Sequence, residues 1–235
     1  EDPFRSLLAE TDFVLYDLKL MDEAAHIRYT GVSNKPILQN FRVLAESGIT
    51  YKSFTVDEEM PEPDEKTVGS AVMNYDISCD AVIAVGSGVI NDTGKILAAT
   101  AKKPYIIVGT APSMDGYASA GTPFLFNGSK STIQCTTPKY IIGDLDILKN
   151  APFEMMLAGI GDMFGKYIVI LDWELARDYS GEYFCDKIAK DVIDATNKCL
   201  ENGYELAKRD KECIKNIMEG FLVTGLGMAY TGNSR

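Results

Sequence analysis

The sequence predicts an α/β fold in which a parallel β-sheet comes first and an all-helical part follows. Up to about residue 108, short apolar runs of strand type alternate with helical stretches, the order that a parallel sheet covered by helices requires. From residue 146 onward, one helical pattern follows another with no strand between them. We therefore expect a domain boundary near residue 145, which divides the chain into residues 1–145 and 146–235.

Before residue 75, segments in which apolar residues alternate as in a strand are followed by segments in which they recur with helical periodicity. The strand-like segments are residues 13–16 and 51–56. The helical segments are residues 23–29, residues 37–47, which Gly48 ends, and residues 65–74. An acidic loop broken by two prolines fills residues 57–64, and we interpret its charges as a solvated run rather than a cation site.

The clearest strand is residues 80–85, whose continuous apolar run after Asp80 is typical of a buried parallel strand. It turns through two glycines into a helix predicted from about residue 90 to residue 101, and residues 104–108 form the next strand. A long loop rich in small residues then runs from residue 109 to about residue 123. The later elements are a hairpin-like stretch at 124–142 and helices at 154–178, 185–202 and 212–230, with Gly203 as the C-cap between the last two.

The composition excludes several classes of function. The 23 basic and 34 acidic side chains leave a net charge of −11, which repels phosphate backbones, so nucleic acid is not an expected partner. No apolar run approaches the roughly 20 residues of a membrane helix, and the first residues do not resemble a signal peptide. We therefore expect a cytoplasmic protein without a membrane span. The oligomeric state stays open, a homo-oligomer included.

The five cysteines are odd in number and widely spaced, so we expect reduced, structural thiols rather than disulfides or a metal knuckle. His26 is the only histidine, which removes most histidine-ligated metal sites, and we interpret it as a helix-surface residue. The chain has no starting methionine and stops abruptly at Arg235, so we expect a fragment.

A candidate phosphate-binding turn stands between the buried strand and the helix that follows it. Its sequence is Gly86-Ser87-Gly88-Val89-Ile90. Free amides in the first turn of a helix can hold an anion, and glycines let a pyrophosphate approach the backbone closely. Asn91 stands where a GxGxxG motif has its third glycine, so the motif alone is weak, and a plain tight turn is the alternative.

A second candidate segment, the loop 110–119, leaves the next strand at the same carboxyl edge. The hydroxyls of Thr110, Ser113 and Ser119 suit a ribose or a phosphate, and Asp115 suits a polyol. The alternative is that these hydroxyls merely satisfy backbone groups of the loop.

A third candidate is Asp162, the one carboxylate in the otherwise apolar helical stretch 159–166. A buried carboxylate without a partner is costly, so it needs a cation. Either a metal ion or Lys166 can supply that charge.

The stretches 86–92, 110–119 and 161–166, in this order and at these separations, resemble the sn-glycerol-1-phosphate dehydrogenase family. That family lies in the superfamily of iron-containing alcohol dehydrogenases, glycerol dehydrogenase and dehydroquinate synthase, and the resemblance covers about residues 49–235. It implies a Rossmann-like domain followed by a helical domain, with zinc or nickel between them. The implied reaction is the NAD(P)H-dependent, metal-assisted reduction of a small molecule, dihydroxyacetone phosphate, to sn-glycerol 1-phosphate.

The resemblance also implies roles for residues that match the family by position. Asp115 matches a residue that contacts the substrate and takes part in catalysis, and Asp162 matches a metal ligand that also faces the substrate. The implied dinucleotide contacts are Gly86, Ser87, Gly88, Val89, Ile90, Thr110, Ala111, Pro112, Ser113 and Ser119.

The sequence departs from the family at its C-terminal end. In the family, two histidines complete the metal site after a segment like Ala229–Arg235, where this chain ends. His26 lies outside the matching region and is no substitute, so we expect weak metal binding and impaired catalysis. The choice between NAD and NADP stays open, as does action on glycerol or another alcohol of the same superfamily.

Residues 8–47 depart from the family as well, because they resemble the radical S-adenosylmethionine activating enzymes of glycyl-radical enzymes. The resemblance rests on residues 11–22 and 30–34 and places Asp17 and Lys19 near an S-adenosylmethionine site. The cluster-binding CxxxCxxC is absent, so radical chemistry is not expected. We expect a fusion that is joined between residues 39 and 49, in which residues 1–48 are of foreign origin. A non-catalytic binding protein is the alternative function that such a fusion allows. The alternative is that residues 13–17 serve as the first Rossmann strand.

Overall fold

The structure is a computed structural model, and it describes residues 13–14, 35, 39, 43, 50–56 and 61–232. Within the expected helix 37–47, Gln39 and Val43 are helical. The expected helix 23–29 lies outside the described residues, as do Asp17, Lys19, His26 and the acidic run 57–59.

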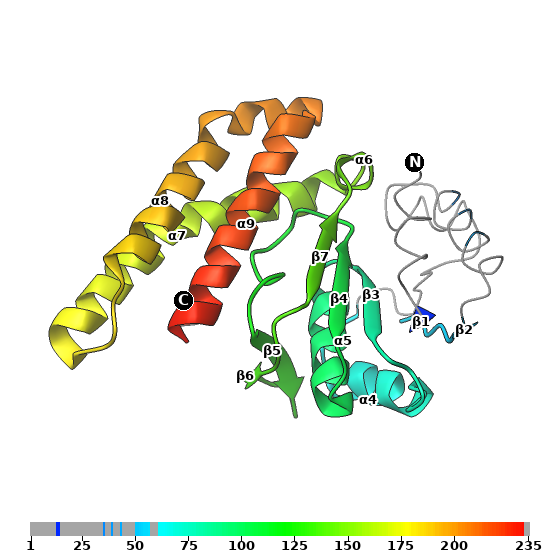
Figure 1. Cartoon of the computed structure of the whole chain (residues 1–235). Coiled ribbons are helices and arrows are strands. Elements are labelled where there is room, and N and C mark those ends of the chain that lie inside the picture. Colours follow the sequence, from blue (N-terminus) through cyan, green and yellow to red (C-terminus); the bar gives the residue numbers. More distant parts are fainter. Residues whose placement is uncertain are drawn as a thin grey trace.

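A parallel three-stranded sheet forms the centre of the N-terminal part (Figure 1). Its strands are β3 (Val82–Gly86), β4 (Tyr105–Gly109) and β7 (Tyr140–Gly143), in the order β3-β4-β7. Gly86 is paired with Gly109, and Gly109 with Gly143, so the three strands end at one carboxyl edge. The predicted parallel sheet is therefore confirmed.

Two helices belong to this part, of which α5 covers the strands and α4 packs against α5. α4 (Glu65–Asn74) begins at Asp64, whose side chain accepts a hydrogen bond from the amide of Thr67 at 2.8 Å. α5 (Gly88–Ala101) joins β3 to β4 and packs against both strands. The helix begins two residues earlier than predicted, because Ser87 alone forms the turn and Gly88 is already helical.

The first two described strands also run parallel. β1 (Phe13–Val14) pairs with β2 (Thr50–Tyr51), which agrees with a strand role for the start of the chain. The predicted strand 51–56 is wrong beyond Tyr51, because residues 52–56 have no regular structure. Their alternation reflects packing instead, since Phe54 and Val56 both contact the main hydrophobic core.

The predicted hairpin 124–142 is only partly correct. The hairpin consists of β5 (Gly121–Phe126) and β6 (Ser129–Gln134), which join through Asn127 and Gly128 with φ angles of 49° and 74°. β7 does not belong to it, because Tyr140–Gly143 pairs in parallel with β4. Pro138 interrupts the chain between the two.

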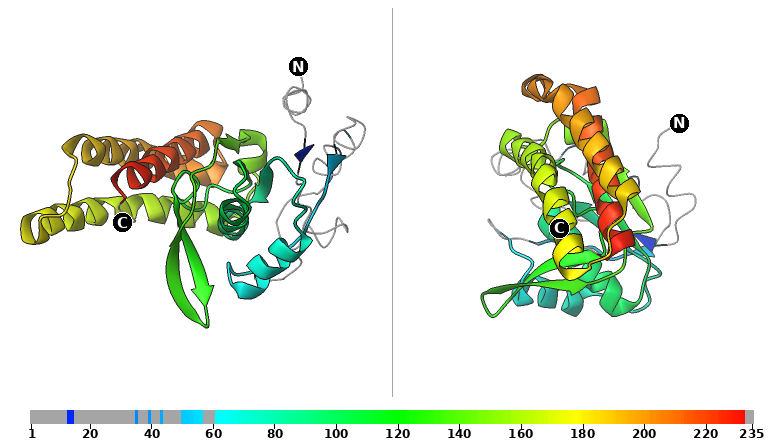
Figure 2. Two further views of the ribbon diagram at one scale, coloured as in Figure 1. Left: turned by 60° about the horizontal axis from the view of Figure 1, so that its bottom comes forward. Right: turned by 90° about the vertical axis from the view of Figure 1, so that its left-hand side faces the viewer.

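The C-terminal part is helical, as predicted. Its elements are α6 (Leu145–Leu148), α7 (Phe153–Ser180), α8 (Asp186–Glu201), the 3₁₀ helix η1 (Gly203–Lys208) and α9 (Lys211–Thr231). Gly203 is not the C-cap of α8, because Asn202 occupies that position after Glu201 and Gly203 opens η1. Figure 2 shows α7, α8 and α9 lying together on one side of the sheet.

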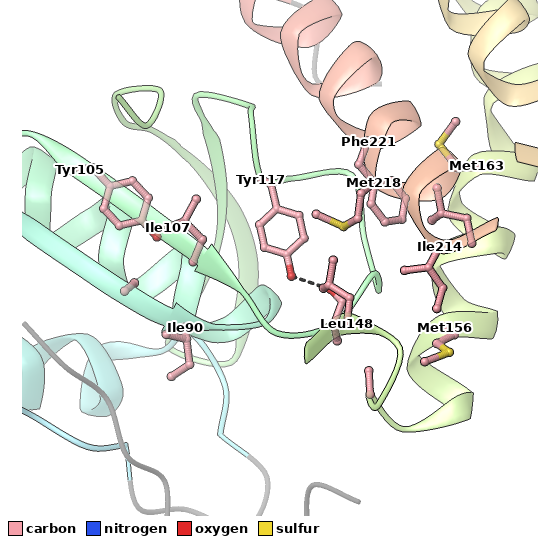
Figure 3. Packing of buried hydrophobic residues seen from close by; sticks show 14 of the residues in the cluster. Ile90, Tyr105, Ile107, Tyr117, Leu148, Met156, Met163, Ile214, Met218 and Phe221 are labelled. Atoms are coloured by element: carbon pink, nitrogen blue, oxygen red, sulfur yellow. Dashed lines mark hydrogen bonds between the residues drawn. The ribbon is translucent and has the colours of Figure 1, made fainter. Parts of the chain in front are cut away.

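One hydrophobic core joins the sheet to these helices. Figure 3 shows Tyr117 between strand residues such as Ile107 and helix residues such as Met218 and Phe221. A smaller cluster around Trp173 joins α7 to α8. All five cysteines are free, as expected. Among the described helices, none is both long and apolar enough to cross a membrane.

Candidate functional site

Two candidate segments leave the same edge of the sheet. β3 ends at Gly86 and β4 at Gly109, and these two residues are paired. The amide of Thr110 donates to the carbonyl oxygen of Gly86 at 3.1 Å, so the pairing continues into the second segment. The structure therefore brings together the turn 86–90 and the loop 110–119, as the order of strands predicted.

The turn 86–90 has glycines for two different reasons. A Cβ on Gly86 would lie 2.5 Å from Cβ of Ile90, so packing within the protein requires glycine there. A Cβ on Gly88 would meet its nearest neighbour, Cγ of Met114, at an ordinary 3.6 Å. Packing within the protein therefore does not by itself require glycine at position 88. Ser87 precedes the helix in extended conformation and makes no side-chain cap, so it does not occupy the amides of the first turn.

The loop 110–119 is held by its own side chains. The buried Tyr117 hydroxyl donates to the carbonyl oxygen of Ala111 at 2.7 Å, and the sulfur of Met114 accepts from the amide of Gly116 at 2.9 Å. Burial raises the pKa of Tyr117, which keeps its hydroxyl a donor. Some polar groups of the loop therefore form hydrogen bonds within the loop, which is the alternative role that the sequence left open.

Lys95 is a part of this region that sequence reasoning missed. Its side chain is fully buried, and its ammonium donates to the carbonyl oxygen of Gly116 at 2.5 Å and to Oγ of Ser119 at 3.2 Å. Burial lowers the pKa of Lys95 to about 8, with the charge of Asp92 opposing the shift. Burial raises the pKa of Asp92 to about 7. The spacing of Asn91, Asp92 and Lys95 along an otherwise apolar helix was the signal that could have revealed them.

Asp115, Asp162 and Lys166 meet although Asp115 is far from the other two in sequence. The amide of Asp115 donates to Oδ2 of Asp162 at 2.8 Å. The ammonium of Lys166 lies 2.5 Å from Oδ2 of Asp115 and 4.0 Å from Oδ1 of Asp162. The side chains of Lys166 and Asp115 are only 7% and 13% exposed, whereas that of Asp162 is 33% exposed. Burial and the neighbouring Asp115 raise the pKa of Asp162.

Lys166 thus pairs closely with Asp115 and lies at the limit of an ion pair with Asp162, so the choice between Lys166 and a metal ion as the cation for Asp162 stays open. Among the residues that the structure describes, no group of three or more histidine, cysteine, aspartate or glutamate side chains could hold a metal ion. Because a catalytic zinc site has three protein ligands, Asp162 and Asp115 do not fit such a site by themselves.

A cavity of about 170 Å³ lies beside Asp115, between the loop 110–119, the hairpin and the end of α9. Polar groups from Asp115, Ser119, Thr132 and Gln134 contribute to its wall. α9 approaches this loop closely, because a Cβ on Gly225 would lie 2.9 Å from the carbonyl oxygen of Asp115. The carboxylate of Asp115 thus stands where the sheet part and the helical part meet.

Comparison with known proteins identifies relatives of the chain. The family model described as iron-containing alcohol dehydrogenase matches residues 14–152. This range begins inside residues 8–47, and the resemblance of those residues to radical activating enzymes remains a prediction.

Among curated proteins, the glycerol-1-phosphate dehydrogenase [NAD(P)+] of Bacillus subtilis is 40% identical over 172 residues, which are 73% of this chain and 44% of that protein. The protein of the same name from Geobacillus thermodenitrificans is 34% identical over 225 residues, with 90% and 56% covered. The chain thus spans about half the length of these relatives.

Solved structures share the fold at low sequence identity. An iron-containing alcohol dehydrogenase from Thermotoga maritima superposes with a TM-score of 0.71 and 18% identity, over 98% of this chain and 65% of that one. A probable glycerol dehydrogenase from Sinorhizobium meliloti 1021 gives a TM-score of 0.69 and 20% identity, over 98% and 64%. These likenesses establish the predicted fold class.

Proposed function

The chain belongs to the iron-containing alcohol dehydrogenase family, and from this premise we propose that it takes part in the NAD(P)H-dependent reduction of dihydroxyacetone phosphate to sn-glycerol 1-phosphate. The names of the curated relatives support this substrate. The chain spans less than two thirds of the length of each of these relatives, so the activity in their name is a proposal for this chain.

One observation carries the proposal: the turn 86–90 and the loop 110–119 leave paired strands at the same carboxyl edge. In open parallel sheets this edge is the usual place for a ligand. In the proposed complex, the pyrophosphate lies against Gly88 and the first amides of α5, where the helix dipole favours an anion. In the same proposed complex, the hydroxyls of Thr110 and Ser113 on the neighbouring loop take further dinucleotide contacts.

The cavity beside Asp115 is the proposed place of the substrate. Reduction transfers a hydride from the nicotinamide to the carbonyl carbon, and the oxygen takes up a proton. In the proposed complex, Asp115 accepts a hydrogen bond from a substrate hydroxyl, and Lys166 pairs with that carboxylate. The family name implies a metal, whether zinc, nickel or iron, but the described residues do not form a complete metal site, so we assign no step to it.

We also propose a division of the chain into two domains. Residues 1–145 form the dinucleotide-binding domain, and residues 146–235 form part of a helical metal and substrate domain. A cytoplasmic location, homo-oligomer formation and the foreign origin of residues 1–48 also stay predictions.

A fluorescence titration with NADH tests the proposed nucleotide site. We expect saturable binding by the parent chain and a loss of at least about tenfold in affinity for Gly88→Asp, because the new carboxylate repels the pyrophosphate. Gly69→Asp is the matched control, since Gly69 lies on α4 and a Cβ there would meet nothing within 4 Å. Equal binding by Gly88→Asp and the parent would remove the claim for this turn.

The same titration, repeated with dihydroxyacetone phosphate and with dihydroxyacetone, tests the substrate class. We expect the phosphorylated compound to tighten NADH binding and dihydroxyacetone to leave it unchanged. The reverse result would assign the chain to dehydrogenases of unphosphorylated alcohols.

A further inference from the structure

We propose that Lys95 is a positioning residue whose buried ammonium fixes the loop 110–119 against α5. The inference rests on the proposed function, because the two segments that Lys95 connects are the proposed nucleotide-binding segments. Lys95 does not line the cavity beside Asp115, so it acts through the loop rather than on a ligand.

The burial of Lys95 is the first observation. The residue is 0% exposed, although lysine is among the residues least often found fully buried. Burying an ammonium is costly unless its hydrogen bonds are restored inside the protein. Both recorded partners of this ammonium, the carbonyl oxygen of Gly116 and Oγ of Ser119, belong to the loop and its end. The cost of burial is therefore offset by contacts to one segment.

The second observation is that several side chains converge on one carbonyl oxygen. The oxygen of Gly116 is approached by Nζ of Lys95 at 2.5 Å, Oγ of Ser119 at 3.1 Å and Nδ2 of Asn91 at 3.3 Å. Asn91 is itself held by the hydroxyl of Tyr105, which lies 3.2 Å from its Oδ1 and 3.1 Å from its backbone oxygen. The first turns of α5, strand β4 and the loop thus form one polar network.

The position of Gly116 has a direct consequence for its neighbour in the chain. Asp115 donates its amide to Asp162 and pairs its carboxylate with Lys166. A displacement of Gly116 therefore moves the group proposed to contact the substrate. The same displacement changes the separation between the loop and the turn 86–90, from which α5 begins.

The charges that face Lys95 decide how it is best replaced. The carboxylates of Asp92 on the same helix and of Asp115 in the loop favour the charged ammonium, whereas burial raises the pKa of Cys135 beyond the hairpin and keeps that thiol neutral. A single Lys95→Met substitution leaves the buried Asp92 without this neighbour, and the variant could fail to fold for that reason alone. The double substitution Asp92→Asn with Lys95→Met removes both charges and separates the two effects.

The test combines hydrogen exchange with an NADH titration on the full chain. In Lys95→Met, we expect amides of residues 111–120 to exchange at least about tenfold faster, amides of α9 to be unchanged, and the dissociation constant for NADH to rise by about tenfold or more. Thr196→Val is the matched control. Thr196 is also fully buried, and its hydroxyl donates to the carbonyl oxygen of Val192 at 2.8 Å in α8. Its loss should leave loop exchange and NADH affinity at the parent values.

The outcomes separate this inference from the proposed function. If the parent does not bind NADH, the proposed function fails, and exchange of residues 111–120 still decides whether Lys95 holds the loop. If Lys95→Met does not fold, the double variant is measured in its place. Parent-like exchange in the loop, in whichever variant folds, overturns the role of Lys95. Faster exchange with unchanged NADH affinity, in a parent that binds NADH, overturns the link to the nucleotide.

Discussion

The backbone of α7 at Gly159 lies directly against the carbonyl oxygen of Pro112. A Cβ placed on Gly159 would stand 2.0 Å from that oxygen, so only glycine permits this approach. Gly225 of α9 makes a similar approach to Asp115 on the other side. The loop 110–119 is thus enclosed by α5, α7 and α9, and small residues on two helices set its distance from them.

The contact between Gly159 and Pro112 predicts the effect of adding one methyl group. Gly159→Ala should destabilise the protein by about 1–3 kcal/mol, because either the loop or the helix must move. Gly161→Ala, two residues along the same helix, should stabilise it by about 0.5–1 kcal/mol, since nothing lies within 4 Å of the added methyl group. Urea unfolding measures both free energies. Similar values for the two variants would show that the loop yields freely.

Lys166 predicts a second effect on stability. Lys166→Met should cost about 3–5 kcal/mol, because it leaves Asp115 buried without its partner. Asp115→Asn in the same chain should recover much of that loss, since the unpaired charge is then gone. Lys187→Met, which breaks the exposed ion pair with Asp191, is the control and should change stability little. No recovery in the double variant would show that packing, and not charge, explains the role of Lys166.

Asp92 predicts how stability changes with pH. Burial raises its pKa from the ordinary 3.8 to about 7, so the folded protein holds a proton that the unfolded chain releases within this range. The unfolded state then binds fewer protons, and the contribution of Asp92 to stability falls as pH rises through this window. Asp92→Asn cannot lose this proton. The free energy of unfolding of the variant, measured relative to the parent, should therefore increase from about pH 4 to about pH 8.

The difference between the two proteins is the informative quantity in that experiment. Exposed carboxylates such as Asp146, whose pKa its lysine partners lower to about 2, give the opposite pH dependence but act equally in both chains. A difference that stays constant over this pH range would mean that Asp92 is ionised in the folded protein at every pH tested.

Much of the fold follows from local sequence signals. The apolar run 80–85 and the long periodic stretch after residue 153 were sufficient to predict β3 and α7, because each element is marked by its own periodicity. The pairing of β7 with β4 was not predicted, since strand pairing is decided by contacts between segments that are distant along the chain. For the same reason the extended residues 52–56 could be mistaken for a strand.

The candidate site was predictable in its segments but not in its contacts. The order of strands predicted that the turn 86–90 and the loop 110–119 would meet. Lys95 was missed because a lysine on a helix is usually solvated, and its spacing from Asn91 and Asp92 on an otherwise apolar helix was the one local signal of its burial. That Lys166 would pair with Asp115 as well as approach Asp162 required the fold itself.

The enclosure of the loop 110–119 also bears on the order in which the protein folds. β3, α5 and β4 are consecutive in the chain, so their contacts close short loops. The bond between Asp115 and Asp162 joins residues 47 positions apart, and the approach of Gly225 to Asp115 closes a longer loop still. Contacts of this kind form slowly, because chain entropy is lost before they return any stability. During refolding, the edge proposed to bind the nucleotide would be present early as secondary structure and would reach its final form only when α9 docks.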